Sequence, residues 1–246
     1  MPRSFSDGPV VVGGVGGSGT RVVAELLRSL GIFMGDDLNH ANDNMRLAGM
    51  FTTFQSLIPG LPTADVDLDD ILDAFERDMH AAYLAQTDRR LGWGWKVPAN
   101  FFILPQLARR YGAFRYIHVM RHGLDMVFSD NQNQVRNFGR HYGIDPGLPP
   151  AAAALRYWIR ANETALADGR RHGIRLLPLS YDRLCAEPGP AIDDLLRFLG
   201  RDAGDRDRLV ALVRPPESIG RHRRERLDFV TDEDRAAIRA LGFDVA

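Results

Sequence analysis

The chain has 246 residues, 45% of them hydrophobic, and a formal net charge of −1 at pH 7. This length suits one domain with a substantial core, and we expect a single domain over residues 1–246. The near-neutral charge argues against nucleic acid or an anionic membrane as a partner. One cysteine, no leader-like start and no run of 18 apolar residues favour a reducing, cytoplasmic location and predict no transmembrane segment.

Short apolar runs alternate with amphipathic stretches along the first half of the chain. Residues 9–15 read PVVVGGV, which is typical of a strand buried on both faces. A helix is predicted from Thr20 to a stop at Gly31, because apolar residues recur there along one side. Residues 36–60 lack a clear period and predict a loop with short helical pieces, and residues 65–87 predict an amphipathic helix.

The second half continues the alternation. The expected elements are a helical stretch over 98–112 interrupted by Pro105, a strand over 114–120 with a helix after Gly123, a loop over 139–150, a helix over 151–173, a strand over 174–181, a helix over 191–200 and a last helix capped by Thr231. Helices alternating with apolar strands predict an α/β fold with a doubly wound, mainly parallel central sheet flanked by helices. Ligands then bind beyond the carboxyl ends of the strands.

A glycine-rich loop follows the first predicted strand. Residues 14–19 keep the G-x-x-x-x-G spacing of a phosphate-binding loop, but Thr20 and Arg21 replace the lysine and hydroxyl residue that a kinase uses for phosphate and Mg²⁺. Backbone amides from Gly16 onward, the hydroxyls of Ser18 and Thr20 and a helix N-terminus remain. This set can bind one terminal oxyanion without metal, and the alternative is a turn that binds nothing.

A second anion site is predicted after the strand over 114–120. Arg121 ends this strand, and Ser129 follows eight residues later, two turns into the predicted helix. Arginine can hold a phosphate through two parallel hydrogen bonds, and the serine adds a hydroxyl. Asp125 lies on the same predicted helix face, where we expect it to stabilise the helix start. R-x₇-S alone is common, and its value comes from its place at the sheet edge where the glycine loop opens.

Two anion sites without features for a magnesium nucleotide suit a ligand that carries phosphates at both its 5′ and 3′ positions. The sequence here resembles the sulfotransferases that use 3′-phosphoadenosine 5′-phosphosulfate (PAPS), in order over nearly the whole chain. The resemblance implies a P-loop-kinase-like sulfotransferase fold. GGSGTR is similar to the family's 5′-phosphosulfate loop, which implies that the 5′ group is held by Gly17, Ser18, Gly19, Thr20 and Arg21.

Further motifs carry the same resemblance. KVPANFFILPQ is similar to a family stretch that places its lysine near the sulfuryl group, and the lysine here, Lys96, is the only one in the chain. LSYDRLCAEPGP resembles a passage that places Tyr181 by the adenine. Arg121 and Ser129, eight residues apart, match the family's 3′-phosphate signature. The C-terminal loop SIGRHR resembles the loop that closes on this phosphate, which implicates Arg221 and, less directly, Ser218 and Arg224.

Three positions depart from the family pattern. Gly17 stands where the family has lysine or arginine, Val22 where an aromatic residue stacks on adenine, and Pro98 where many members have a histidine base. We expect Arg21 to supply the missing cation. Lys96 and Arg21 then stabilise the sulfonate and leaving-group oxygens, and neighbouring cations lower the pKa of Lys96.

The general base is expected in the segment GDDLNHANDN, residues 35–44, because other family members place a carboxylate after the first helix. Asp43 or His40 is favoured over Asp36 and Asp37. The alternative for each is an Asx-rich loop that caps its own backbone. His118, in contrast, falls within a predicted strand and is expected to be a hydrogen-bonded core residue.

These residues predict a sulfotransferase that moves a sulfuryl group from PAPS to a hydroxyl or amine and releases 3′,5′-bisphosphoadenosine without metal. The acceptor is a small molecule, a saccharide, a lipid or a peptidyl group. A P-loop small-molecule kinase and a non-catalytic adenine-nucleotide-binding module remain alternatives. The absent Walker lysine disfavours the first, and the departures at Gly17 and Pro98 keep the second open. The oligomeric state is not indicated.

Overall fold

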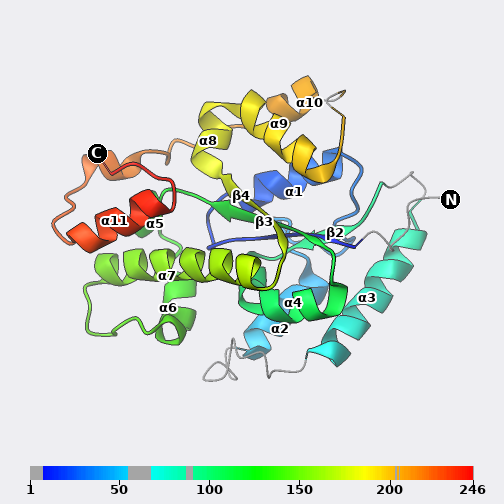
Figure 1. Ribbon diagram of the computed structural model, residues 1–246, viewed down its shortest axis with the longest axis horizontal. Coiled ribbons are helices and arrows are strands. Elements are labelled where there is room, and N and C mark those ends of the chain that lie inside the picture. The colour runs from blue at the N-terminus through cyan, green and yellow to red at the C-terminus, as the bar shows by residue number, and fades with distance from the viewer. Residues whose placement is uncertain (1–7, 55–67, 87–90, 203, 205, 246) are drawn as a thin grey trace.

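The computed structural model describes residues 8–54, 68–86, 91–202, 204 and 206–245. Four strands within these residues form one parallel sheet in the order β2-β1-β3-β4 (Figure 1). The strands are β1 (Val10–Gly13), β2 (Gly94–Lys96), β3 (Arg115–Met120) and β4 (Arg175–Ser180). The expected α/β fold with a parallel central sheet is therefore confirmed.

Helices cover both faces of this sheet. In Figure 1, α1 and α8 to α10 lie on one side of it, and α2 to α4 and α7 lie on the other. The helices are α1 (Thr20–Ser29), α2 (Met45–Phe54), α3 (Asp69–Leu84), α4 (Leu104–Tyr111), α5 (Gly123–Val127), α6 (Asn133–Phe138), α7 (Pro150–Arg171), α8 (Tyr181–Ala186), α9 (Pro188–Leu199), α10 (Arg206–Leu212) and α11 (Asp232–Ala240), with 3₁₀ turns η3 (Pro98–Ile103), η4 (Gly139–Tyr142) and η6 (Arg221–Arg224). Among these described helices, none combines the length and apolarity that crossing a membrane requires.

The strand pleat divides the core into two clusters. Val11, Trp95 and Tyr116 face the cluster under α4 and α7, whereas Val12 and Ile117 face the cluster under α1 and α9. This alternation follows from the period of two in a strand, and it explains why the strands are apolar on both faces.

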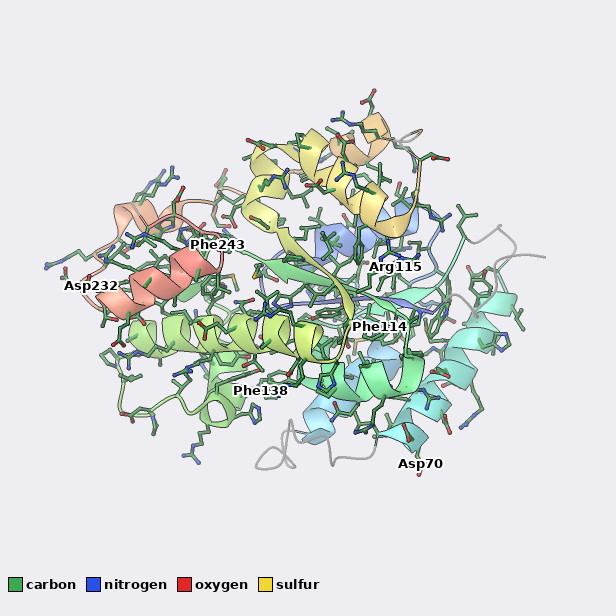
Figure 2. All side chains as sticks on the ribbon, viewed as in Figure 1. Asp70, Phe114, Arg115, Phe138, Asp232 and Phe243 are labelled. Atoms are coloured by element: carbon green, nitrogen blue, oxygen red, sulfur yellow. The ribbon has the colours of Figure 1, made fainter. Side chains whose placement is uncertain are left out.

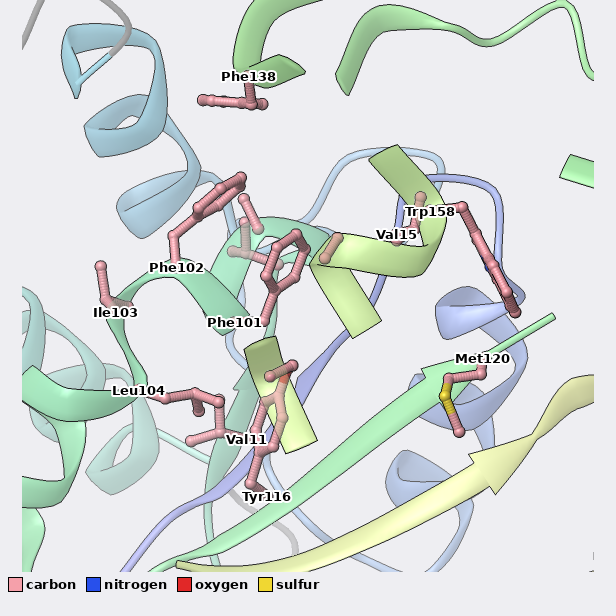
Figure 3. Close-up of a cluster of buried hydrophobic side chains, with 14 of the residues drawn as sticks. Val11, Val15, Phe101, Phe102, Ile103, Leu104, Tyr116, Met120, Phe138 and Trp158 are labelled. Carbon is pink, nitrogen blue, oxygen red and sulfur yellow. The ribbon is translucent and has the colours of Figure 1, made fainter. Parts of the chain in front are cut away.

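Figure 3 shows part of the first cluster, in which η3 inserts two aromatic rings between the sheet and α6. Phe101 stacks on Phe102 with ring centroids 4.3 Å apart, and Phe102 packs against Phe138 at 4.6 Å. Other charged side chains lie at the periphery, whereas a few, such as Lys96 and Asp125, are buried. Asp70 and Asp232 point outward from α3 and α11 in Figure 2, and both are exposed.

Several element boundaries differ from the expectations. The strand expected to reach residue 181 ends at Ser180, and α8 begins at Tyr181. The short strand β2 and the helices α6 and α10 were not predicted, because each is too short to show a period. The helix expected from 65 begins at Asp69, and residues 55–67 and 87 lie outside the described residues.

Both tryptophans of the segment before Lys96 belong to the hydrophobic core. Trp93 and Trp95 are buried, and Trp95 donates from Nε1 to Asn100 Oδ1 at 3.1 Å. The expected N-cap of the last helix is confirmed, since Thr231 and Asp234 form a reciprocal capping box at the start of α11.

Candidate functional site

The parallel sheet brings four sequence-predicted positions to one edge. Gly14 follows β1, Lys96 ends β2, Arg121 follows β3 and Tyr181 follows β4. β1 lies between β2 and β3, so the chain leaves β1 toward one side of the sheet and later crosses to the other. Such a reversal opens a crevice at the carboxyl ends of the strands, and ligands of α/β sheets bind there.

The glycine loop has the features of an anion site. Gly19 begins α1 with a φ of 96°, a conformation that favours glycine. The hydroxyl of Ser18 is buried and has no hydrogen-bond partner within the described residues. The first turn of α1 reads TRVV and carries no acidic residue. An incoming oxyanion would satisfy the Ser18 hydroxyl and complement the positive end of α1.

Two backbone amides of this loop already have partners, whereas we expected the amides from Gly16 to Thr20 to be free, and Ser18 N donates to the Val15 carbonyl at 3.0 Å. Gly16 N donates to Gln134 Oε1 at 2.9 Å, and the Tyr157 hydroxyl donates to the same oxygen at 3.3 Å. Gln134 comes from α6, 118 positions away, and no motif marked it. No signal in the sequence could have found this contact.

Tyr181 adjoins both the glycine loop and Arg121. A Cβ added to Gly19 would lie 2.3 Å from the Tyr181 ring, so glycine is needed for this approach. The Arg121 guanidinium carbon lies 5.9 Å from the centroid of the same ring. Burial, the largest cause, raises the pKa of the Tyr181 hydroxyl to about 12. The two predicted anion sites are thus neighbours, because both adjoin one aromatic ring.

The Arg121 site gathers the residues expected at the 3′ end. Arg121 is buried, and its Nη2 donates to the Ser218 carbonyl at 2.5 Å and to the Ser218 hydroxyl at 3.0 Å. Arg221 Nε donates to the same carbonyl at 3.2 Å, and Arg221 Nη1 donates to the Phe128 carbonyl at 2.8 Å. Arg121 Nε is buried without a partner among the described residues. Two guanidinium groups therefore bind the same Ser218 carbonyl oxygen, and Arg121 Nε is left to bind a ligand.

Ser129 occupies a different setting from the one expected. Helix α5 ends at Val127, so Ser129 lies beyond it and not two turns into a helix. Its hydroxyl accepts from Asn131 N at 3.3 Å. It still adjoins Phe128, whose carbonyl binds Arg221, and this keeps it beside the Arg121 site. Arg224, which the resemblance also implicated, is exposed.

Asp125 does more than stabilise the start of α5. Its side chain is 0% exposed and accepts from Gly220 N at 2.6 Å, from His222 N at 3.2 Å and from His222 Nδ1 at 2.6 Å. It also lies 3.6 Å from Arg121 Nη2. Burial opposes ionisation, but these hydrogen bonds outweigh it and lower the pKa of Asp125. The sequence predicted its place in the first turn but not its partners.

Lys96 and Asp43 form an ion pair at the end of β2. Lys96 is 1% exposed, and its Nζ lies 2.5 Å from Asp43 Oδ1. Asn39 Nδ2 donates to Asp43 Oδ2 at 2.9 Å, and Asn39 Oδ1 accepts from Asp43 N at 2.9 Å. Asp43 is 20% exposed, so a ligand can reach it.

The pKa of Lys96 is lowered as expected, but neighbouring cations are not the main cause. Burial of the ammonium is the largest cause, the hydrogen bond and charge of Asp43 act against it, and the charge of Arg21 adds a smaller lowering effect. The low dielectric of the site therefore disfavours the charged lysine unless an anion is beside it.

The other predicted residues of this end lie outside the pair. Arg21 is 60% exposed and bonds Glu25 Oε1 at 3.1 Å, one turn along α1. Asp36 pairs with Arg46 at 3.1 Å, and His40 is exposed. Among the described residues, no three His, Cys, Asp or Glu side chains gather as a metal ion would require.

Comparison with known proteins identifies the family of this chain. Residues 9–205 match the model of the sulfotransferase family, and the chain therefore belongs to that family. No curated protein matches. The sulfotransferase domain of the Synechococcus PCC 7002 olefin synthase is 17% identical, with a TM-score of 0.53 over 98% of this chain and 97% of that one, so the two share a fold.

Two further solved structures are similar to a smaller degree. Sulfotransferase STF1 from Mycobacterium tuberculosis H37Rv is 16% identical, with a TM-score of 0.48 over 83% of this chain and 70% of that one. Mouse SULT7A1, solved in complex with PAP, is 13% identical, with a TM-score of 0.44 over 97% of this chain and 83% of that one.

Proposed function

We propose that this sulfotransferase transfers a sulfuryl group from PAPS to an acceptor hydroxyl or amine. One observation carries the proposal. The glycine loop and Arg121 of the Arg121–Arg221 pair both adjoin the Tyr181 ring, and the Lys96–Asp43 pair stands at the same sheet edge. Two anion sites that adjoin one aromatic ring fit an adenylate that is phosphorylated at both ends.

The residues present fit this donor. At the 5′ end, the unpartnered Ser18 hydroxyl, the amides of Gly17, Gly19 and Thr20 and the start of α1 would hold the phosphosulfate. At the 3′ end, Arg121 and Arg221 would exchange the Ser218 carbonyl for phosphate oxygens, since charge-assisted hydrogen bonds are stronger than neutral ones. Tyr181 would line the adenosine between them.

The chemistry divides between the two members of the ion pair. PAPS supplies an activated sulfuryl group on its 5′-phosphate. During transfer the acceptor oxygen or nitrogen forms a bond to sulfur, the bond from sulfur to the 5′-phosphate oxygen breaks, and that phosphate keeps the electron pair. Lys96 stabilises the charge that develops on the leaving oxygen, and Asp43 accepts the proton of the acceptor. Asp43 is preferred to His40 because Asp43 is the one held against Lys96.

The two alternative functions have less support. A P-loop kinase needs a lysine at the position of Thr20. Here that position holds a buried, uncharged threonine. A non-catalytic binding module has no need of a buried ion pair at the end of β2, where an uncompensated lysine is costly.

Transfer of ³⁵S-labelled sulfate from PAPS to a panel of phenolic, sterol, saccharide, lipid and peptidyl acceptors tests the proposal. Lys96→Met and Asp43→Asn should each reduce transfer at least about 100-fold, as for other lost charge-stabilising or acid–base groups. Asp36→Asn, in the same loop but paired with Arg46, is the matched control and should retain the rate.

Three outcomes of this experiment are informative. Transfer that depends on Lys96 and Asp43 supports the proposal. Transfer by wild type that both variants retain would refute the roles of the pair. Binding of 3′,5′-bisphosphoadenosine with no transfer to any acceptor would favour the binding module.

A further inference from the structure

We propose that Asp125 and His222 are positioning residues that seat the C-terminal strap, residues 218–224, on the Arg121 site and thereby create the preference for a 3′-phosphorylated adenylate. This inference rests on the proposed function. It assigns a role to two side chains that neither bind the ligand nor take part in the transfer. Figure 1 shows the C-terminal segment, coloured orange to red, at the end of the molecule where α5 lies.

Three hydrogen bonds from the strap end on one carboxylate. Gly220 N and the backbone and ring nitrogens of His222 all donate to Asp125, at 2.6, 3.2 and 2.6 Å. Asp125 is 0% exposed and His222 is buried. A buried carboxylate without such donors would carry a large desolvation penalty, so the strap and Asp125 stabilise each other.

His122 supports His222 from the other side. The two rings stack with centroids 4.2 Å apart and an interplanar angle of 25°. His122 Nδ1 accepts from Leu124 N at 3.2 Å, and His122 Nε2 donates to the Asp244 carbonyl at 2.7 Å. Because a backbone amide can only donate and a carbonyl can only accept, both contacts assign a neutral His122. A flat uncharged ring therefore fixes the plane of His222.

The strap in turn completes the cationic site. Arg221 is carried by the strap, whereas Arg121 follows β3, and the two meet on the Ser218 carbonyl. Arg221 is also adjacent in sequence to both residues that bind Asp125, Gly220 and His222. A strap that leaves Asp125 therefore carries away one of the two guanidinium groups. The glycine loop follows β1 and Tyr181 follows β4, so neither is part of the strap, and we expect the loss to fall mainly on the 3′ end.

The test compares the affinities of 3′,5′-bisphosphoadenosine and 5′-AMP by calorimetry. We expect Asp125→Ala and His222→Ala to reduce the ratio of the two affinities by about tenfold or more, the effect of one lost charge-assisted contact, and to leave 5′-AMP binding within about twofold. Asp125→Asn, which keeps an acceptor oxygen, should restore part of the ratio. The double variant should reduce the affinity ratio little more than either single variant does, because the two residues act as a unit.

Asp228→Ala is the matched control. Asp228 lies in the segment after the strap and forms an exposed ion pair with Arg226 at 2.7 Å, so its loss should leave the ratio unchanged. If Asp125→Ala does not fold, His222→Ala decides the question, because it leaves Asp125 beside Arg121. An unchanged ratio in His222→Ala would overturn the inference alone. A wild-type protein that binds the two nucleotides equally would overturn the proposed function as well.

Discussion

Lys96 shows how one residue can be both predicted and misjudged from sequence. It is the only lysine among 31 cationic residues, and its place before a proline carries the family resemblance. The structure buries it against Asp43 and makes burial the main cause of its lowered pKa. A lysine is better suited than an arginine to such a slot, because its ammonium is compact and changes its pKa readily.

A direct measurement of the Lys96 pKa tests this description. Selective labelling with ¹⁵N and ¹³C lysine gives one ammonium signal, since the chain has one lysine. We expect its titration to fall below the ordinary value of 10.5, and Asp43→Asn to lower it further, because Asp43 supports the charged form. Asp36→Asn should leave it unchanged. A wild-type pKa at or above 10.5 would contradict the buried pair.

His118 is the second residue whose charge state the fold determines. The expectation of a core histidine is confirmed, since it is 0% exposed and bonded to Tyr116 and Asn162. Burial lowers the pKa of His118 from 6.5 to about 4. The unfolded chain therefore binds the extra proton first, and stability is lost as the pH falls from 6.5 toward 4.

Urea unfolding at pH 7 and pH 4.5 tests whether the protein loses stability as the pH falls. Wild type should lose about 2 kcal/mol more of its unfolding free energy than His118→Gln over this interval, because protonation favours the unfolded chain by about 1.4 kcal/mol for each pH step below the ordinary pKa. The exposed His172→Gln is the control and should lose as much as wild type. An equal loss in wild type and His118→Gln would mean that His118 does not resist protonation.

At the scale of elements, the glycine loop offers a matched pair of positions. Gly19 has a φ of 96°, and an added Cβ would lie 2.3 Å from Tyr181. Gly16 lacks a positive φ, and its added Cβ would first meet Gln134 at an ordinary 3.5 Å. The structure thus requires glycine at Gly19 but not at Gly16, although both residues lie in the same loop.

Alanine at each position separates the two cases. Gly19→Ala should destabilise the protein by about 2 to 4 kcal/mol through backbone strain and overpacking, and should weaken bisphosphate binding. Gly16→Ala should stay within about 0.5 kcal/mol. Denaturant midpoints measure both. Equal small effects would contradict the close approach of Tyr181 to the loop.

Long periodic elements could be predicted from sequence, and short ones could not. Helices α1 and α7 lie close to their expected ranges because their apolar residues recur over several turns. Three-residue β2 shows no period, and five-residue α5 stops before Ser129 because Asp130, Asn131 and Gln132 turn the chain there. Contacts such as Asp125 with His222 join residues 97 positions apart, and no local pattern encodes them.

For the whole molecule, the decisive feature is the order of the sheet. Each of the four parallel strands delivers one predicted residue to the same edge, and the reversal at β1 places the glycine loop beside Arg121. The sequence motifs predicted these residues from their order along the chain. They could not reveal that the Ser218 carbonyl accepts from Arg121 or that Gln134 accepts from the Gly16 amide, since those partners come from remote segments.

Thermal unfolding with and without nucleotide tests the central claim most directly. The claim is that one adenylate with phosphates at both ends binds across Tyr181 without a divalent ion. A ligand at 100 times its Kd adds about 2.7 kcal/mol. For a domain of this size, 3′,5′-bisphosphoadenosine in chelator should then raise Tm by roughly 5 to 10 °C. Mg-ATP should not match this shift. A rise in Tm with Mg-ATP and none with the bisphosphate would contradict the account.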